Sequence, residues 1–559
     1  MRRFFFSFLL FFFLTLLIYK DLYFSAYQQD EWHALGFIKS EGLRYLITQT
    51  SFIGLFLFES RFFARLVNMI LFGYFGLNTF PLFLFSIFFH ALNTSLVFIL
   101  FKKILKKEFI AFIASLFFLI NDTSKQALIW YGTATGTLPS TTTILLAIIC
   151  YFAFIEKKKL YFYFLSIICI FISIAFKETA IFLFIFLPFL DFLLKRYKKE
   201  KSRSLKPALL LLLGGVLYVT LKIINIFFLR SDYSGYVSSS NGNAFYKLLW
   251  MAISYPVETL SQLLIPDAIF YPFSQKFTFA IFPYFEQVGY ATQVSEKVVV
   301  ELLSVLVTLL IFIPLIFFVL MKRKNKLQFW IFSGLYLLSF LPFIVIKKTS
   351  GYLESRYYYT FVIPFALFVG IFIDTLVAIA KKKKDSNLYK LSFVILISIF
   401  SLFLFWHVKY IHKQLVFQKE KADVQKPILA FITSNITSGK KQIYYIESDR
   451  NFVVEGNPLP FQQGIGYMLL VLRAEKGDKS VLPYLNDNFF WELGNQGYKE
   501  KNGTGFGYYS DFRRLALDLR KYKINPQTVT AFSYNSETKK TTNISEEIQR
   551  RLNNNRQSI

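Results

Sequence analysis

Two adjacent carboxylates, Asp30 and Glu31, follow the first apolar segment of the chain, in the stretch AYQQDEWHALGFI (26–38). A carboxylate at the edge of a membrane is suited to act as a general base toward a substrate carried by a lipid. A solvated loop would place acidic side chains at the end of a span equally well. Asp30, Glu31 and His33 are also weak candidate ligands for a divalent cation, since no further ligand at a metal-binding spacing is visible.

Further ionisable and aromatic residues stand at the ends of later apolar segments. They are Asn121, Asp122 and Lys125 with Trp130 nearby, then Lys177 and Glu178, and finally Glu354 and Arg356 with Tyr357. Ionisable side chains at membrane depth are costly and commonly mark a functional site. Each set also has a structural interpretation: a loop, the cap of a tight helical hairpin, or a cation in an interfacial aromatic belt. His90 and Asn93, at i,i+3 spacing, favour polar contacts between helices over a ligand role.

The composition determines the class of protein that holds these residues. Of the 559 residues, 55% are hydrophobic and 71 are Phe, and the mean hydropathy is +0.44. Repeated apolar runs of about 20 residues indicate transmembrane helices, so we predict an all-α polytopic membrane protein. The net charge of +28 comes from short Lys and Arg clusters between apolar runs, which indicates topology signals and not a nucleic-acid surface. Cys150 and Cys169 both lie inside apolar runs, so neither a disulfide framework nor a metal spacing is predicted.

About eleven apolar segments are long enough to be considered as spans. They are 3–19, 80–101, 109–120, 138–155, 160–176, 179–194, 207–229, 297–320, 327–346, 359–380 and 390–408. The first is interpreted as an uncleaved span because its apolar run is long and no cleavage site follows. With Arg2 and Arg3 inside, every dense basic cluster between spans falls on the cytoplasmic side. Counting 61–77 as a span would break this agreement, so we interpret it as an interfacial amphipathic helix.

This topology places the candidate residues and two long connections, 20–79 and 230–296, outside the cytoplasm. It divides the chain into a transmembrane domain (1–408) and a polar extracytoplasmic domain (409–559). In the second domain, strand-like QIYYIES and TVTAFSYN alternate with helix-like DFRRLALDLRKY, which predicts a small α/β or α+β fold. The last stretch, NISEEIQRRLNNNRQSI, is interpreted as a frayed helical tail. The bias toward Phe, Lys, Ile and Asn is typical of AT-rich bacterial genomes, so we expect a bacterial inner membrane.

A sugar linked to a polyprenyl phosphate would need this combination of residues. Its transfer requires a base for the acceptor and cations for the leaving phosphate, on which negative charge builds up. Arginine suits the phosphate through its bidentate fork. No nucleotide-binding loop is needed for such a donor, and none is visible in the sequence.

The motifs, taken in order, resemble those of GT-C-fold glycosyltransferases, notably the branch of protein O-mannosyltransferases and lipid A aminoarabinose transferases. The matching residues are Asp30 and Glu31, Arg61 opening the next helix, His90 and Asn93 in HALN, Trp130, Lys177 and Glu178 in KET, and Glu354, Arg356 and Tyr357 in E-x-R-Y. The resemblance covers roughly residues 1–380. The C-terminal domain matches no family that we can name, and the soluble insert of the eukaryotic mannosyltransferases is missing.

The resemblance implies a polyprenyl-phosphate sugar donor and an inverting transfer on the outer face of the membrane. It makes Asp30 the base, with Glu31 as a support or as the alternative base, and it places Arg356, Lys177 and Arg61 at the donor phosphate. Glu178 would orient Lys177, and the remaining matched residues would support the site. The acceptor, which is a protein, a lipid or a glycan, stays open. No cofactor is predicted beyond a possible divalent cation.

Two functions from other classes remain as alternatives. A transporter or flippase of lipid-linked glycans would share the environment, but transporters commonly interrupt their helices at the bilayer midplane. The spans here are mostly unbroken, and the polar residues gather at one rim, which favours chemistry at the surface. A non-catalytic membrane anchor for the C-terminal domain would not need such a rim.

Overall fold

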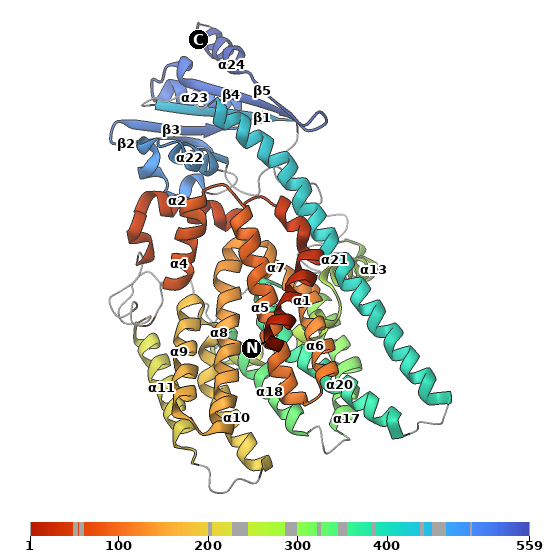
Figure 1. The fold of residues 1–559 in the computed structure, drawn as a ribbon. Coiled ribbons are helices and arrows are strands. Elements are labelled where there is room, and N and C mark those ends of the chain that lie inside the picture. The colour runs from red at the N-terminus through yellow and green to blue at the C-terminus, as the bar shows by residue number, and fades with distance from the viewer. Residues whose placement is uncertain are drawn as a thin grey trace. The chain divides into compact units, whose positions relative to one another are not determined.

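The chain is a multi-pass, mostly helical membrane protein with a small C-terminal sheet (Figure 1). A computed structural model describes residues 2–47, 54, 57, 61–198, 204–225, 244–284, 299–320, 326–344, 355–382, 387–435, 441–449, 465–491 and 495–557. Glu354, one of the predicted site residues, lies outside the described residues.

Seven helical segments in the described part of the chain are long and apolar enough to cross a membrane. They are Phe4–Phe24 in α1 (Arg2–Tyr19) and η1 (Lys20–Phe24), α5 (Phe80–Leu105), α8 (Tyr131–Lys157), α11 (Lys206–Ile224), α16 through α17 (Val300–Leu320), α18 with α19 (Lys326–Ile344), and Val362–Ile379 in α20 (Val362–Lys382). A span needs about 20 residues at 1.5 Å per residue. The predicted count of about eleven is therefore not confirmed.

The other four predicted spans are also helical, but they differ in length from a simple span. Helices α6 (Glu108–Ile120), α9 (Leu160–Phe176) and α10 (Leu183–Lys198) have 13, 17 and 16 residues. The segment 390–408 is part of the 48-residue helix α21 (Asn387–Ser434). The segment 61–77 forms α4 (Phe62–Asn68) and the wider turn η3 (Met69–Tyr74), an apolar helix that is also shorter than a span.

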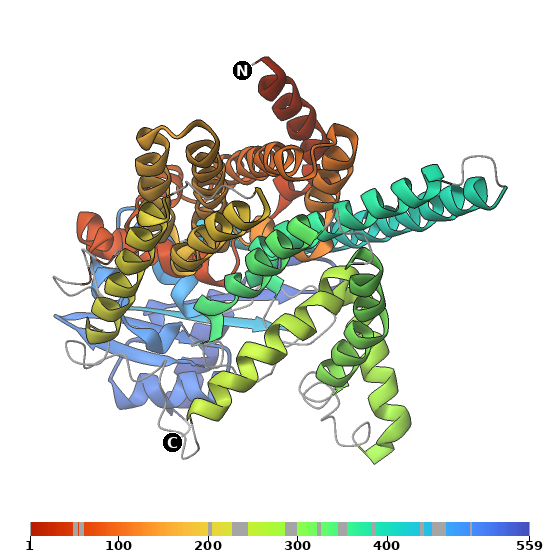
Figure 2. The same cartoon turned by 90° about the horizontal axis from the view of Figure 1, so that it is seen from below.

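Small and hydroxyl residues lie at contacts between helices, which Figure 2 shows from below. Ser140 on α8 and Ser173 on α9 hydrogen-bond through their hydroxyls at 2.8 Å, and Ser166 Oγ donates to the Ala147 carbonyl at 2.9 Å. Gly370 on α20 faces Ala114 on α6, where an added Cβ would approach the Ala114 Cβ to 3.1 Å. Close backbone approach and interhelical hydrogen bonds are the usual means by which helices associate in lipid.

Short elements connect these helices and carry several candidate residues. They are η2 (Gly42–Leu46), η4 (Asp122–Ser124), α7 (Lys125–Ile129), η5 (Glu178–Phe182) and η11 (Ser355–Thr360). The predicted outer connection 230–296 contributes α12 (Ala244–Leu264) and α13 (Asp267–Ile281).

The chain forms two compact units that do not follow its order. The first consists of Met1–Lys20, Ile47–Arg65 and Leu84–Lys413. The second consists of Asp21–Leu46, Leu66–Phe83 and Gln414–Ile559. The second unit thus includes parts of the predicted connection 20–79, among them α2 (Gln29–Glu41), which carries Asp30 and Glu31.

A five-stranded mixed sheet forms the centre of the second unit, in the order β2-β3-β1-β4-β5. The strands are β1 (Lys441–Ser448), β2 (Gly497–Lys501), β3 (Thr504–Tyr509), β4 (Val529–Asn535) and β5 (Lys540–Asn543). Strand β1 pairs in parallel with β3 and β4, and the two outer pairs are antiparallel. Strands β1 and β4 contain the two strand-like sequences predicted above.

Helices cover both faces of this sheet. On one face, α23 (Phe512–Lys521) and α24 (Ser545–Gln557) pack against Ile443 and Ala531. The C-terminal segment is therefore not a frayed tail, because Ile548 and Leu552, four residues apart on α24, are buried in this core. On the other face lies α22 (Ile465–Glu475), followed by η12 (Lys479–Tyr484) and η13 (Asn488–Phe490).

Candidate functional site

Three cations from distant parts of the sequence gather in the first unit around one carboxylate. Arg61 precedes α4, Lys177 lies between α9 and η5, and Arg356 belongs to η11. The carboxylate is Glu178, and the rings of Trp130 and Tyr357 border the group. We call these six residues the cation cluster.

Arg61 and Glu178 form the ion pair of the cluster. Arg61 Nη2 and Nε both lie 3.1 Å from Glu178 Oε2. Burial raises the pKa of the Glu178 carboxyl, but Arg61 and Lys222 outweigh this effect and hold the pKa below its ordinary value. Glu178 is consequently a charged carboxylate at neutral pH.

Lys177 is held by α8 and by an aromatic ring. Its Nζ donates to Thr137 Oγ1 at 2.7 Å and lies 5.4 Å from the centre of the Tyr357 ring. Burial, Arg61 and Arg356 together lower the pKa of Lys177 to about 7, while Glu178 opposes them. A lysine whose pKa is lowered by two neighbouring cations lies in a place that favours an added anion.

Arg356 is flanked by two aromatic rings. Its guanidinium carbon lies 4.9 Å from the centre of the Trp130 ring and 5.2 Å from that of Tyr357. Cation–π contacts of this kind help to fix the position of a guanidinium. Trp130 comes from the N-cap of α8, so η11 and α8 together determine where the Arg356 charge lies.

His90 and Asn93 both contact η11 through one hydroxyl, that of Tyr359. His90 Nδ1 lies 2.8 Å from the Tyr359 hydroxyl, and Asn93 Nδ2 donates to the same oxygen at 3.1 Å. His90 Nε2 reaches the Leu119 carbonyl at 3.0 Å, and Thr142 Oγ1 donates to Asn93 Oδ1 at 2.6 Å. His90 and Asn93 therefore link α5, α6, α8 and η11. They contact η11 at Tyr359, three residues after Arg356.

Asp122 and Lys125 form a second ion pair, which is fully buried. Lys125 Nζ lies 2.7 Å from Asp122 Oδ2, and the Asp122 backbone N–H donates to His407 Nδ1 at 2.8 Å. Burial raises the pKa of Asp122 against the opposing effect of Lys125. Asn121 fixes the turn to α12, because its Nδ2 donates to the Leu263 carbonyl at 3.0 Å.

The acidic pair lies in the second unit, and its two members have different environments. Glu31 is fully buried, and its Oε2 accepts the backbone N–H of Gln28 at 2.7 Å, so it caps the start of α2. Asp30 lies in the first turn of α2 with an exposed side chain. The solvent-facing carboxylate is thus Asp30, whereas Glu31 has a structural role.

His33 packs against aromatic rings of the second unit. Its ring centre lies 4.5 Å from that of Phe37, 4.4 Å from that of Trp491 and 5.8 Å from that of Tyr467. Burial lowers the pKa of His33 to about 4. No three His, Cys, Asp or Glu side chains in the described ranges are grouped so that they could hold a metal ion, and Asp30, Glu31 and His33 do not form such a group.

The structure brings together Arg61, Trp130, Lys177, Glu178, Arg356 and Tyr357, and places His90 and Asn93 behind Tyr359. Sequence analysis missed Thr137, whose hydroxyl holds Lys177, and Tyr359, whose hydroxyl contacts His90 and Asn93. Thr137 lies in the Thr- and Ser-rich start of α8, a run that could have indicated polar partners. Tyr359 had no distinguishing signal among its tyrosine neighbours.

The chain has a distant structural likeness to a known protein. No protein-family model matches the chain, and no curated protein matches its sequence. Among solved structures, the chain is similar to the crystal structure of ArnT from Cupriavidus metallidurans bound to undecaprenyl phosphate. The TM-score is 0.37 at 12% sequence identity, covering 78% of this chain and 82% of that chain.

Proposed function

We propose that this protein is a membrane glycosyltransferase that takes a sugar from a polyprenyl-phosphate donor and transfers it to an acceptor outside the cytoplasm. The cation cluster carries the proposal. Two cations hold the leaving phosphate as its charge develops, and burial strengthens their effect. The multi-pass helical architecture places the protein in the bilayer, which is also where a polyprenyl tail is soluble.

In this proposal Arg356 and Lys177 contact the donor phosphate, while Arg61 acts through Glu178 and adds to the positive potential. Arg356 is positioned by two aromatic rings, and the planar fork of its guanidinium suits the oxygens of a phosphate. Asp30 is the base that takes the acceptor's proton during an inverting attack on the anomeric carbon. Glu31 and Glu178 position other groups.

Purified full-length protein in lipid nanodiscs, with a panel of undecaprenyl-phosphate sugars, tests these roles. We expect Arg356→Ala to weaken donor binding about tenfold to a hundredfold, the size of a lost charged hydrogen bond. We expect Asp30→Asn to bind the donor normally and to lose turnover. Arg196→Ala, which removes an exposed arginine on α10, is the matched control and should change neither.

Three outcomes would contradict the proposal. If undecaprenyl phosphate does not bind, the cluster is not a phosphate site. If turnover survives in Asp30→Asn, the base is a different residue. If a labelled lipid-linked sugar crosses vesicle membranes without being consumed, the protein is a transporter of lipid-linked glycans.

A further inference from the structure

Helix α12 carries exposed apolar side chains, followed by a row of buried polar ones. Leu249, Trp250 and Ile253 are 48%, 61% and 56% exposed. A buried polar stripe follows on the same helix, made of Ser254, Tyr255, Glu258, Thr259 and Gln262, all at most 4% exposed. The spacing i, i+1, i+4, i+5, i+8 places these five residues on one face. A helix of this polarity is expected beside lipid when its inner face lines a polar site.

Each residue of the stripe has a polar atom without a hydrogen-bond partner. These atoms are Ser254 Oγ, Tyr255 OH, Glu258 Oε2, Thr259 Oγ1 and Gln262 Nε2, and Ser304 Oγ on the adjoining α16 is a sixth. Buried polar groups are nearly always paired in native proteins, because an unpaired group costs about 1–3 kcal/mol. Six such atoms side by side therefore indicate a polar ligand that fills the face.

The unpaired atoms indicate a neutral ligand with many hydroxyls. The hydroxyls of the stripe and a protonated Glu258 carboxyl can both donate and accept hydrogen bonds, and Gln262 Nε2 can donate. Burial and the neighbouring Glu301 raise the pKa of Glu258 to about 9, so its carboxyl is protonated at neutral pH. A divalent cation is a poor fit, since the described part of the chain has no group of three ligating side chains.

One end of the stripe is connected to the element that carries Arg356. The Tyr358 hydroxyl donates to Gln262 Oε1, and Tyr358 lies two residues from Arg356 in η11. In a polyprenyl-phosphate sugar, the anomeric carbon is bonded directly to the phosphate. A sugar whose phosphate is held by Arg356 must lie close to that residue, and the stripe begins there.

We propose that the buried polar stripe of α12 binds the sugar of the lipid-linked donor through its hydroxyls. This inference rests on the proposed function of the cation cluster. The stripe selects the sugar, whereas Arg356 and Lys177 bind the phosphate that all such donors share.

The test compares undecaprenyl phosphate with undecaprenyl-phosphate carrying a pentose, a hexose or an N-acetylhexosamine, all in nanodiscs with full-length protein. We expect wild type to bind at least one sugar-bearing lipid more tightly than undecaprenyl phosphate. Thr259→Val should reduce that gain about fivefold to tenfold, the size of one neutral hydrogen bond, and leave affinity for undecaprenyl phosphate unchanged. Glu258→Leu should reduce the gain more than Glu258→Gln, which keeps a neutral donor and acceptor.

The matched control is Thr278→Val on α13, because the Thr278 hydroxyl already donates to the Ser274 carbonyl at 2.9 Å. It should not change the gain. Thr259→Val should fold normally, since an apolar side chain of the same shape removes an unpaired polar atom. The inference is wrong if wild type binds undecaprenyl phosphate but no sugar-bearing lipid more tightly, or if the gain survives in Thr259→Val and Glu258→Leu. If wild type does not bind undecaprenyl phosphate, the proposed function fails and this inference fails with it.

Discussion

Gly36 of α2 lies against the ring of Tyr467 of α22, so closely that an added Cβ would be 2.2 Å from the phenolic oxygen. The Tyr467 ring cannot easily move away, because it is buried and its hydroxyl donates to the Leu485 carbonyl at 3.0 Å. Lys39 Nζ pairs with Glu475 Oε1 at 3.1 Å on the same two helices. The helix that carries Asp30 is thus packed directly on the C-terminal part of the second unit.

Gly36→Ala should separate these two helices. We expect a loss of stability of about 1–3 kcal/mol, the usual result of overpacking a buried contact. Thermal unfolding of the purified protein measures the change, and hydrogen exchange of α2 and α22 peptides locates it. Gly214→Ala is the control, because nothing lies within 4 Å of an added Cβ there. Equal effects of both substitutions would show that the contact with Tyr467 is unimportant.

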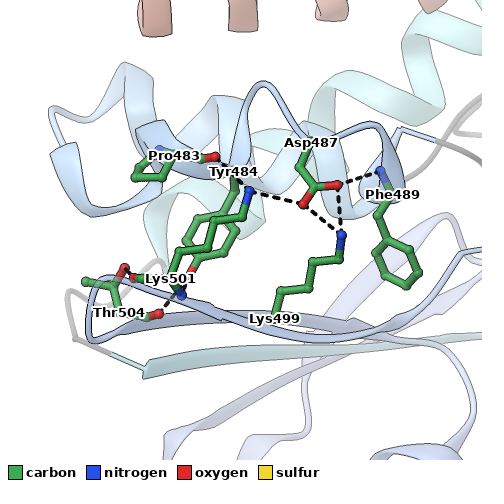
Figure 3. A network of polar contacts seen from close by, with 7 residues as sticks. All are labelled: Pro483, Tyr484, Asp487, Phe489, Lys499, Lys501 and Thr504. Atoms are coloured by element: carbon green, nitrogen blue, oxygen red, sulfur yellow. Dashed lines mark hydrogen bonds and ion pairs between the residues drawn. The ribbon is translucent and has the colours of Figure 1, made fainter.

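Asp487 fixes the loop that reaches the end of α2 (Figure 3). Its carboxylate accepts from Lys499 Nζ at 2.7 Å and from the Phe489 backbone N–H at 3.0 Å, and Lys501 Nζ lies 3.1 Å away. The preceding residue, Asn486, accepts from Ser40 Oγ at 2.8 Å and donates to Glu41 Oε1 at 2.6 Å. The loop therefore connects strand β2 to α2.

Asp487→Asn should destabilise the second unit by about 1–3 kcal/mol at pH 7, because two lysines lose their carboxylate. Burial raises the pKa of Asp487, but its hydrogen bonds and Lys501 together lower it below the ordinary value. A lowered pKa stabilises the fold above the unfolded value of about 3.9, and this contribution is lost as the pH falls below it. Denaturation of both proteins from pH 7 to 3 should show the difference shrinking, and a constant difference would contradict the charge effect.

His33 should make the second unit sensitive to acid. Its pKa of about 4 in the fold is below the ordinary value of about 6.5, so the unfolded chain binds more protons between these values. Stability is fully present above about pH 6.5 and falls toward pH 4. His33→Phe should remove that part of the pH dependence, as measured by thermal unfolding between pH 7 and 4. His412→Phe, at an exposed position on α21, should not change it.

Lys177 should make phosphate binding depend on pH. Its pKa is about 7 in the free protein, and a bound phosphate raises it. The complex then holds more protons than the free protein above pH 7, so affinity falls as the pH rises from 6 to 9. A lipid-linked sugar is the right probe, because its phosphodiester does not titrate in this range. Lys177→Arg keeps its charge and should give a flat profile; a matching slope in both proteins would assign the proton to another group.

The sequence singled out the residues that the structure groups in the cation cluster, and it did not predict the length of every helix. Lys177 and Arg356 stand out because charges are rare beside long apolar runs, and a common membrane face limits where they can lie. The predicted span at 109–120 is not confirmed, because α6 has only 13 residues. The sequence shows where apolar runs lie, but it does not show how far each helix continues.

Other features had no local signal. The contact between Gly36 and Tyr467 joins segments far apart in the sequence, and each helix looks ordinary by itself. Glu31 shows a similar limit, since Gln28 is an uncommon N-cap and the sequence did not indicate that Glu31 caps α2. Glu258 was visible as a carboxylate within an apolar stretch, but the sequence does not say which face of α12 is buried.

The packing of α2 on α22 also determines when α2 can fold against its partner during translation. Roughly 420 residues separate the two helices, which corresponds to about 20–80 s of synthesis at 5–20 residues per second. During this interval the face of α2 that includes Gly36 and His33 has no partner from α22. The central strand β1 likewise cannot pair with β3 and β4 until these strands have been synthesised. We therefore expect a ribosome-bound chain that stops before Gln414 to leave α2 accessible to proteases, and the helix with Asp30 to gain protection only when translation is nearly complete.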